Sequence, residues 1–330
     1  MRDIREYIKY LPVNSARKLM IYQNIRELYW RIKYSGNDYN NILRNRTFCN
    51  TNYYYGHEYW MKRHSGYSGF IYGLIEHGLY FGDNSSKVGF KEEWDLGSII
   101  TFGDSRINLL KDLYPDYYIF GVGPRIHYAE MDNVFYNQLK SQINPNEKTM
   151  VLYPFHSEYS KKAGYDTEVF MKNASDLAKD LGVGNILVSL HPADIANHFD
   201  REYEGKRFIT VSAGLDQIRF LPKLKAIMSI ADIIYSNAIG THVGYSLYLN
   251  KPNIINLTSN KTILEKSKYN EEQELFAKTF NGNSPFSITA EQRELCDYYF
   301  GYRYIRTPED LYKIFEDCDE QFTRRFKRKM

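Results

Sequence analysis

Cysteine is scarce in this sequence, and long hydrophobic runs are missing from it. Cys49, Cys296 and Cys318 lie far apart, are odd in number and form no C-x-x-C pair, which argues against a disulfide framework or a zinc site and fits a reducing compartment. No stretch approaches the roughly 18 to 20 apolar residues that a membrane span needs, and residues 1–6 lack the apolar segment of a signal peptide. The sequence therefore predicts a protein that stays in the cytoplasm.

Two familiar phosphate-binding motifs are also absent. The sequence has no G-x-x-x-x-G-K-[ST] loop, and residues 121–124 (GVGP) lack the third glycine of a dinucleotide fingerprint. An acid-x-acid pair at residues 317–319 (DCD) is of the kind that binds a divalent cation in some sugar transferases, but it lies in a segment typical of a solvated helix. We therefore expect neither a metal site nor a required cofactor.

Net charge is low as well. The formal charge of +3 is too small to indicate a nucleic-acid partner. The positive charge is nevertheless uneven, because residues 324–329 read RRFKRK. Such a cluster can rest on an anionic membrane surface, at about 1 kcal/mol per cation. A solvated tail is the equally simple alternative, so peripheral contact with the inner face of the cytoplasmic membrane is an expectation from this cluster alone.

What is present has the composition of a soluble protein with room for two cores. The 330 residues are 43% apolar and 25% charged. Residues 141–148 are polar and unpatterned and contain a proline, which favours a linker there. We expect an acceptor-side domain over residues 1–145 and a nucleotide-sugar-binding domain over 146–330, whose last helix is free to return to the first domain.

Strands alternate with helices in both predicted domains. Residues 16–34 have helical spacing, and residues 35–68 have poor periodicity and favour loops or an acceptor-facing segment. Strands are then expected at residues 69–75, 98–102, 117–120, 149–153, 185–190 and 208–211, with helices near 105–114, 166–181 and 219–230. This alternation predicts an α/β protein with two Rossmann-like domains, each a parallel sheet, facing a cleft.

Residues 231–257 predict one strand, turn, helix and strand unit of such a sheet. Ser236, Gly240, Thr241 and His242 fall between the strand and the first turn of the helix. Backbone N–H groups and the positive end of the helix dipole favour an anion at such a turn, which would suit a phosphate or diphosphate. An ordinary helix N-cap is the alternative.

Two earlier strands of the second half end in histidine. His156 and Ser157 follow one of them, and His191 and Pro192 follow the next. Because the carboxyl ends of parallel strands meet at one edge of the sheet, these side chains are expected to converge with the turn at residues 236–242. Imidazoles, hydroxyls and a helix N-terminus suit a nucleotide phosphate without a metal.

In the first half, the candidate catalytic groups lie in the turn at residues 76–83. His77 follows a strand and precedes Gly78, and its ordinary pKa near 6.5 would let it take a proton from an attacking hydroxyl. Glu76 and Asp83 are rival bases or partners that orient the imidazole. A histidine hydrogen-bonded within a tight turn is the structural alternative.

The order of these motifs resembles the GT-B glycosyltransferases that build bacterial capsules, lipopolysaccharide, O-antigen and related polymers. It is most similar to the sialyl- and Kdo-transferase-like group that uses CMP-sugars, with CDP-glycerol and CDP-ribitol phosphotransferases as neighbours. The resemblance spans roughly residues 69–257 and rests on His77-Gly78, Pro154-x-His156-Ser157, His191-Pro192, Asp232-x-x-x-Ser236-x-x-x-Gly240-Thr241 and Lys251-Pro252.

By this resemblance, His191-Pro192 would contact the cytidine monophosphate part of the donor, and Ser236 or Thr241 the donor phosphate. The family often uses a carboxylate as general base, so the local sequence Glu76-His77-Gly78 leaves open whether a histidine or an acid performs that role. The resemblance implies a glycosyltransferase that moves a sugar, most simply a CMP-linked acidic sugar, to a hydroxyl of a glycan or lipid-linked glycan. A polyol-phosphate transferase and a non-catalytic glycan-binding subunit are the alternatives.

Overall fold

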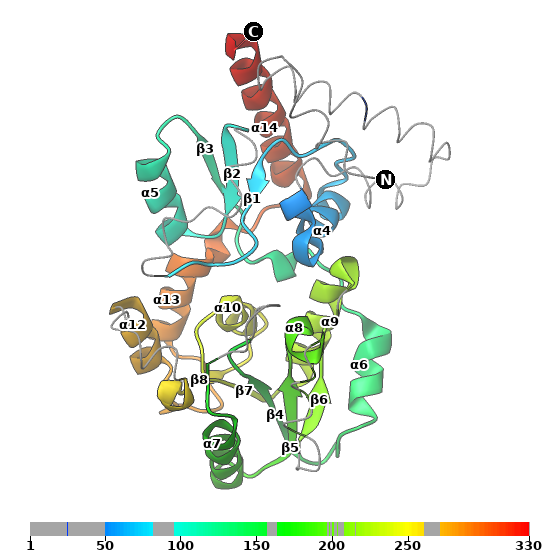
Figure 1. Ribbon diagram of the computed structural model, residues 1–330, viewed down its shortest axis with the longest axis vertical. Helices are drawn as coiled ribbons and strands as arrows, with labels where there is room; N and C mark the ends of the chain where they lie inside the picture. Colours follow the sequence, from blue (N-terminus) through cyan, green and yellow to red (C-terminus); the bar gives the residue numbers. More distant parts are fainter. Residues whose placement is uncertain are drawn as a thin grey trace.

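The computed structural model describes residues 25, 50–81, 96–156, 164–196, 198, 200, 203, 208–214, 216–260 and 271–329. Two parallel sheets lie towards opposite ends of the long axis of the molecule, with helices around and between them (Figure 1). This confirms the predicted α/β class with a parallel sheet in each half.

The first sheet has the strand order β1-β2-β3 among the described residues. Its strands are β1 (Leu74–Ile75), β2 (Ser98–Thr101) and β3 (Tyr118–Gly121), and α5 (Asp104–Leu113) connects the last two. All strand pairs are parallel, with Ile99 opposite Ile119 in the β2–β3 register. The chain reaches this sheet through η1 (Asn50–Gly56) and α4 (His57–Ser65).

The second sheet has the order β6-β5-β4-β7-β8 and is also parallel throughout. After η4 (Arg125–His127) and α6 (Asn133–Lys140), the chain forms these elements in turn: β4 (Lys148–Tyr153), α7 (Thr167–Asp180), β5 (Val183–Ser189), α8 (Pro192–Ala196), β6 (Ile209–Val211), α9 (Gln217–Ile230), β7 (Ile233–Ser236), α10 (Thr241–Tyr248) and β8 (Asn253–Ile255). The chain runs outward from β4 to β6 and then returns to the other side of β4. The strand order therefore reverses between β4 and β7, a topological switch point where ligands bind in open α/β sheets.

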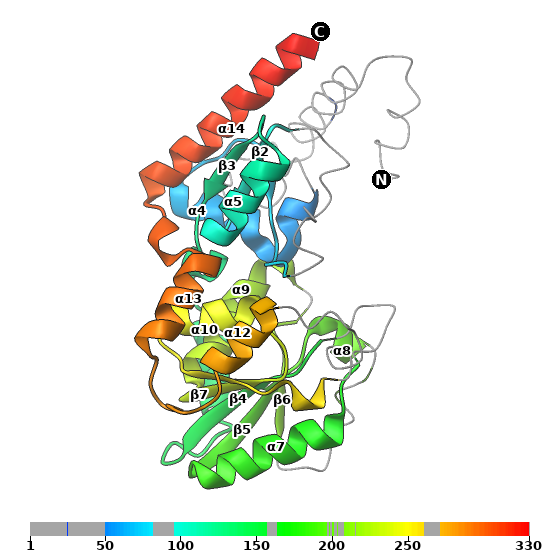
Figure 2. The same ribbon diagram turned by 90° about the vertical axis from the view of Figure 1, so that its left-hand side faces the viewer.

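The last part of the chain runs back along the molecule. It comprises η6 (Leu257–Ser259), α12 (Glu271–Thr279), α13 (Ala290–Phe300), η7 (Tyr302–Tyr304) and α14 (Pro308–Lys329). Helix α13 packs against α10 and α5, and α14 packs against α4, β2 and β3 (Figure 2). Tyr72 stacks on Phe322 of α14 at a ring-centroid distance of 4.5 Å. The C-terminal helix therefore completes the core around the first sheet.

Packing joins the two halves. One cluster of buried side chains runs from Ile100 and Phe102 of the first half to Val151 and Leu187 of the second.

Two of the three cysteines, Cys296 and Cys318, lie in the described residues. Both are buried free thiols, and burial raises the pKa of each to about 12. Cys49 lies outside the described residues.

The sequence prediction differs from the structure most clearly at residues 50–65. Loops were expected there, but η1 and α4 form instead. Helix α4 is buried on most sides, and it includes the fully buried ion pair between Glu58 and Lys62. A helix that buries charged as well as apolar residues has no amphipathic pattern, which is why periodicity did not reveal it. The expected helix over residues 16–34 lies outside the described residues, apart from Ile25, which is helical.

Candidate functional site

A cavity of about 200 Å³ lies between the two halves of the molecule. One wall of the cavity is formed by the turns that follow β4, β5 and β7. The opposite wall is formed by η1, the start of α4 and the turn after β1. Thr241 of the second half approaches Gly78 of the first, since a Cβ atom placed on Gly78 would lie 3.7 Å from Thr241 Oγ1. The lining includes Tyr55, His57, His77, Tyr153, His156, His191, Phe220, Gly240, Thr241, His242 and Tyr245.

The cavity occupies the topological switch point of the second sheet. His156 follows β4 and the segment 238–242 follows β7, the two adjacent strands between which the order reverses. Their carboxyl ends meet at the same edge of the sheet, so the topology itself brings these turns together. Asn237 fixes the turns relative to each other, because its Oδ1 accepts a hydrogen bond from the Phe155 amide at 2.6 Å and its amide group donates to Ser259 Oγ at 2.9 Å.

The N-terminus of α10 points its first turn towards this cavity. Gly240 is the N-cap residue and has an extended backbone, and no side chain caps the helix. The first N–H groups of a helix have no partner within the helix, and the dipole makes this end positive. Gly240, Thr241 and His242 all line the cavity, so these groups can meet an anionic ligand.

His191 presents a defined hydrogen-bond donor. Its Nδ1 accepts a hydrogen bond from the Ala193 amide at 3.1 Å, so a neutral ring carries its proton on Nε2. That nitrogen lies 3.4 Å from the hydroxyl of Tyr55, which also lines the cavity. The ring also stacks on His156 at 4.5 Å. Burial, with a contribution from His156, lowers the pKa of His191 to about 3, which keeps this donor neutral.

His242 is held flat against an aromatic ring. Its imidazole stacks on Tyr153 with a centroid distance of 5.2 Å and an interplanar angle of 12°. Burial is the main reason that its pKa falls to about 3, and His156 lowers it further. Nε2 of His242 is buried and has no hydrogen-bond partner among the described residues. The nitrogen is therefore a group that a bound ligand could satisfy.

The opposite wall contributes His77 and His57. His77 lies in the turn after β1, and burial lowers its pKa although Glu76 opposes the shift. His57 begins α4, is only 1% exposed, and has no hydrogen-bond partner for Nδ1 among the described residues. Burial, Arg125 and His77, in that order, hold the pKa of His57 well below 6.5. Both imidazoles are therefore neutral at pH 7, and the stronger lowering of the His57 pKa makes His57 the weaker base of the two.

Glu76 lies behind this wall. Its carboxylate pairs with the guanidinium of Arg106 and accepts a hydrogen bond of 2.5 Å from Thr101 Oγ1. Glu76 is 1% exposed and is absent from the cavity lining. Next to it, the buried guanidinium of Arg125 donates to the carbonyl groups of Gly123 at 2.6 Å and Thr101 at 3.1 Å. These charges connect the ends of β1, β2 and β3 and fix the turn that carries His77.

The structure thus gathers six of the predicted site residues around one cavity: His77, His156, His191, Gly240, Thr241 and His242. Ser236 is fully buried at the end of β7 and does not line the cavity. Pro192 is the first residue of α8. Asp83 and Ser157 lie outside the described residues.

Sequence reasoning missed the residues that η1 and α4 bring to the cavity. Tyr55 has a positive φ of 56°, as does Gly56 at 73°, and this sharp turn directs the Tyr55 ring against Phe220 at 4.4 Å. A Cβ atom on Gly56 would lie 2.6 Å from the Gln217 carbonyl oxygen, so only glycine fits there. The pair Gly56-His57 was a usable signal, because it places a histidine next to a glycine turn as at His77-Gly78.

The described residues contain no group of three or more His, Cys, Asp or Glu side chains arranged to hold a metal ion.

Part of the basic cluster near the C-terminus makes contacts within the protein. Arg325 donates to the Asp116 carbonyl at 3.1 Å, and Arg324 pairs with Glu320 at 3.0 Å. In the part of the chain that the structure describes, no helix is both long enough and apolar enough to cross a bilayer.

Comparison with known proteins gives similarity in fold only. No protein-family model matches the chain, and no curated protein matches it in sequence. A structure of the wall teichoic acid polymerase TagF is 14% identical, with 78% of this chain and 68% of that chain covered and a TM-score of 0.45. The UDP-GlcNAc 2-epimerase from Methanocaldococcus jannaschii is 14% identical, with coverages of 96% and 89% and a TM-score of 0.44. The enzyme of that name from Neisseria meningitidis, bound to UDP-GlcNAc, is also 14% identical, with coverages of 95% and 83% and a TM-score of 0.40.

The chemistry that this protein can perform is indicated by the cavity between the two halves. It combines a helix N-terminus and hydrogen-bond donors on one wall with neutral imidazoles on the other, and no carboxylate is among the described residues that line it. Such a site can bind an anion on the α10 side and accept a proton on the side of His57 and His77.

Proposed function

We propose that this protein is a transferase that takes a group from a cytidine-nucleotide donor and attaches it to a hydroxyl of a surface glycan. The favoured donor is a CMP-linked acidic sugar, which makes the protein a glycosyltransferase. The observation that carries the proposal is the position of the cavity. It lies at the switch point of a parallel sheet, with the α10 N-terminus on one side and His57 and His77 on the other.

On the donor side, the phosphate is assigned to the first turn of α10. The backbone N–H groups there and the Thr241 hydroxyl can donate to phosphate oxygens. His191 supplies a further donor through Nε2, with its tautomer fixed by the Ala193 amide. These groups would stabilise the negative charge that develops on the leaving nucleotide. Thr241 takes the role of phosphate-binding hydroxyl in preference to Ser236, because only Thr241 lines the cavity.

On the acceptor side, the proton is assigned to a histidine. The acceptor hydroxyl gives its proton to His77 or His57, and its oxygen forms a bond to the anomeric carbon of the donor sugar. The bond from that carbon to the phosphate oxygen breaks, and CMP leaves with the electron pair. Lowered pKa values keep both imidazoles in the proton-accepting form at neutral pH. Glu76 orients the turn, because its carboxylate is already bound by Arg106 and Thr101.

A polyol-phosphate transferase is the second candidate. It is favoured by one observation, the absence of a carboxylate from the described lining of the cavity. In that reaction the acceptor oxygen would attack the second phosphorus of a CDP-polyol, and the bond between the two phosphates would break. Both reactions release CMP, so they are distinguished by which donor is consumed. A glycan-binding subunit without activity would show no response to nucleotides at all.

The first experiment is a thermal-shift screen of the full chain against CMP, CDP, UDP, GDP and dTDP. A ligand at 100 times its dissociation constant stabilises the folded state by about 2.7 kcal/mol. We expect CMP and CDP to raise the melting temperature more than the other nucleotides at equal concentration. Stabilisation by UDP or GDP alone would overturn the cytidine assignment, and no shift with any nucleotide would favour the glycan-binding subunit.

The second experiment separates donor binding from proton transfer. His191→Ala should raise the dissociation constant for CMP about tenfold or more, since a donor to the nucleotide is lost. His77→Ala and His57→Ala should leave that constant within a factor of about three and lower kcat by roughly 10² to 10⁴ for whichever residue is the base. His198→Asn is the matched control, because His198 is exposed, has a positive φ that asparagine tolerates, and is not a cavity residue. Unchanged kinetics in all three alanine variants would remove the assignment.

A further inference from the structure

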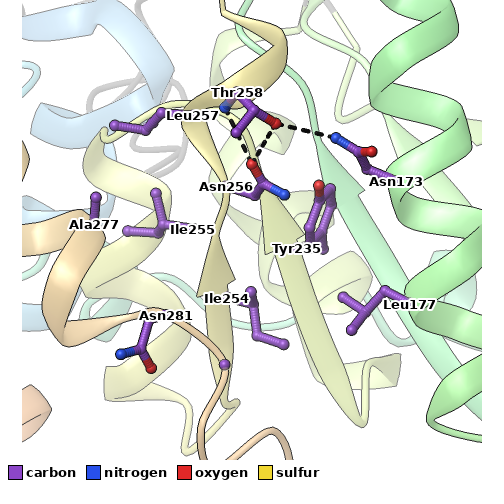
Figure 3. Close-up of a pocket in the computed structure, with 11 residues that line it drawn as sticks. Asn173, Leu177, Tyr235, Ile254, Ile255, Asn256, Leu257, Thr258, Ala277 and Asn281 are labelled. Carbon is purple, nitrogen blue, oxygen red and sulfur yellow. Dashed lines mark hydrogen bonds between the residues drawn. The ribbon is translucent and has the colours of Figure 1, made fainter.

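A second cavity, of about 600 Å³, lies around the edge strand β8 of the second sheet, between α7 on one side and α12 on the other (Figure 3). It shares no lining residue with the cavity between the two halves. Its walls come from α7, β7, β8, η6, α12 and the residues that follow α12. The volume is within the range of roughly 300 to 1,000 Å³ that small-molecule sites have.

The walls of this edge cavity are of two kinds. One part is aliphatic and the other carries amides and hydroxyls. The described residues that line it include no Asp, Glu, Lys, Arg or His. The aliphatic part is formed by Leu177, Ile254, Ile255, Leu257 and Ala277, and the polar part by Asn173, Tyr235, Asn256, Thr258 and Asn281.

The polar groups are held in place by a short chain of hydrogen bonds (Figure 3). Asn173 Nδ2 donates to Thr258 Oγ1 at 3.1 Å, and Thr258 Oγ1 donates to Asn256 Oδ1 at 2.7 Å. The backbone N–H of Thr258 donates to the same Asn256 oxygen at 3.1 Å, which fixes the orientation of that amide. The Asn256 amide nitrogen therefore points towards the Tyr235 side of the cavity (Figure 3).

Tyr235 adds a buried hydroxyl. The residue is only 1% exposed, and its hydroxyl makes no hydrogen bond of ordinary geometry. The amides of Asn173 and Asn256 are near enough to counteract in part the effect of burial, which raises the Tyr235 pKa to about 12. A ligand hydroxyl that meets the Tyr235 hydroxyl with better hydrogen-bond geometry than these two amides would therefore be favoured.

The edge of the sheet is not open to another strand at this point. Ile255 of β8 donates its backbone N–H to the Phe280 carbonyl at 2.9 Å, so the segment after α12 already occupies that backbone position. Addition of a peptide strand to β8 is thereby disfavoured. A charged ligand is disfavoured too, because it would lose hydration without gaining an opposite charge.

We propose that the edge cavity binds a neutral saccharide. Sugar hydroxyls both donate and accept hydrogen bonds, which suits the amides and hydroxyls of the lining, such as those of Asn256, Asn281 and Tyr235. The C–H faces of the ring match the aliphatic wall of Leu177 and Ile254. If the transferase function holds, this site binds a neutral sugar unit of the glycan acceptor at a distance from the hydroxyl that reacts. That last step rests on the proposed function, whereas saccharide binding does not.

The test is saturation-transfer difference NMR on the full chain. The probes are glucose, galactose, N-acetylglucosamine, maltotriose and chitotriose, with glucuronic acid and sialic acid as charged counterparts. Binding of at least one neutral sugar, at least tenfold tighter than that of the acids, supports the proposal. Absence of binding by every neutral sugar overturns it, and so does equal binding of neutral and acidic sugars.

Two pairs of variants place the binding. Asn173→Ala removes a polar group from the cavity, and Ser175→Ala on the exposed side of α7 is its control. Ala277→Phe fills the cavity from α12, and Lys278→Phe at the next, exposed position is its control. We expect a loss of sugar affinity of tenfold or more in the first member of each pair only. Unchanged sugar binding in both Asn173→Ala and Ala277→Phe overturns the assignment to this cavity.

The same variants keep the two proposals apart. CMP stabilisation depends on the cavity between the halves, so it should be the same in Asn173→Ala and Ala277→Phe as in the parent chain. Lost sugar binding with intact CMP binding supports the edge site and shows that the variants fold. Sugar binding without any nucleotide response would retain the edge site and remove the transferase.

Discussion

At the scale of single residues, the site depends on histidines kept neutral by burial. Five of the eight histidines in the sequence line the cavity between the two halves. The pKa of His191 and that of His242 both fall to about 3, whereas an unfolded chain holds histidine near 6.5. Burial of these neutral rings lowers the free energy of unfolding below pH 6.5, because the unfolded state binds protons there and the folded state does not.

This linkage predicts a loss of stability in acid. Above about pH 6.5 the two histidines are neutral in both states and do not lower the free energy of unfolding. As the pH falls from 6.5 towards 3, only the unfolded state is protonated, so the free energy of unfolding declines in that window. Between pH 7 and pH 5 we expect the free energy of unfolding to fall by about 2 kcal/mol for each of them. Urea denaturation at several pH values measures this slope.

The matched variants for that slope are His191→Gln with His242→Gln, and His198→Asn as an exposed control. The double variant should flatten the pH dependence between pH 7 and pH 5, and the control should leave it as it is. A slope that stays the same in the double variant would show that other groups cause the acid sensitivity.

At the scale of elements, α10 is positioned by its contact with α13. A Cβ atom on Gly244 of α10 would lie 2.1 Å from Cγ of Phe300, so the helices approach each other only because residue 244 has no side chain. The hydroxyl of Tyr302, just after α13, donates to the Gly244 carbonyl at 2.8 Å. The contact with α13 therefore holds α10 in the position from which its N-terminus faces the cavity.

Gly244→Ala should therefore force the two helices apart. We expect a loss of about 1 to 3 kcal/mol in the free energy of unfolding, as for other overpacked sites, together with weaker CMP binding. Phe300→Leu should relieve part of the clash, so the double variant should be less destabilised than the sum of the two single variants. Strict additivity in that cycle would mean that the two side chains do not meet.

The elements also show what sequence reasoning can reach. Strands β4, β5 and β7 are short buried runs followed by polar turns, so the pattern located them and, with them, His156, His191 and His242. Helix α4 escaped because its buried face includes Glu58 and Lys62, which conceal the apolar period. His57, the first residue of that helix, was missed for the same reason, and Tyr55 was missed because it lies in the sharp turn before the helix. The engagement of Glu76 by Arg106, 30 positions later, is a tertiary contact that no local pattern reveals.

At the scale of the whole molecule, the two sheets share one core. Buried side chains run without interruption from the first sheet to the second, and α4 is tied to α9 through the Trp60 indole, which donates to the Ile218 carbonyl at 2.8 Å. A molecule joined in this way should unfold as one cooperative unit. We expect a single calorimetric transition whose calorimetric and van't Hoff enthalpies agree. Two separate transitions would contradict it and would indicate two cores that melt independently.

The return of α14 to the first sheet has a consequence for synthesis in the cell. Residues 308–329 supply packing for β2, β3 and α4, and the ribosome makes them only after the whole second sheet has been made. At typical elongation rates of 5–20 residues per second, β2 and β3 wait roughly 10 to 40 s for this helix. During that interval the nascent first sheet lacks its cover, so it is the part of the chain on which chaperones would be expected to act.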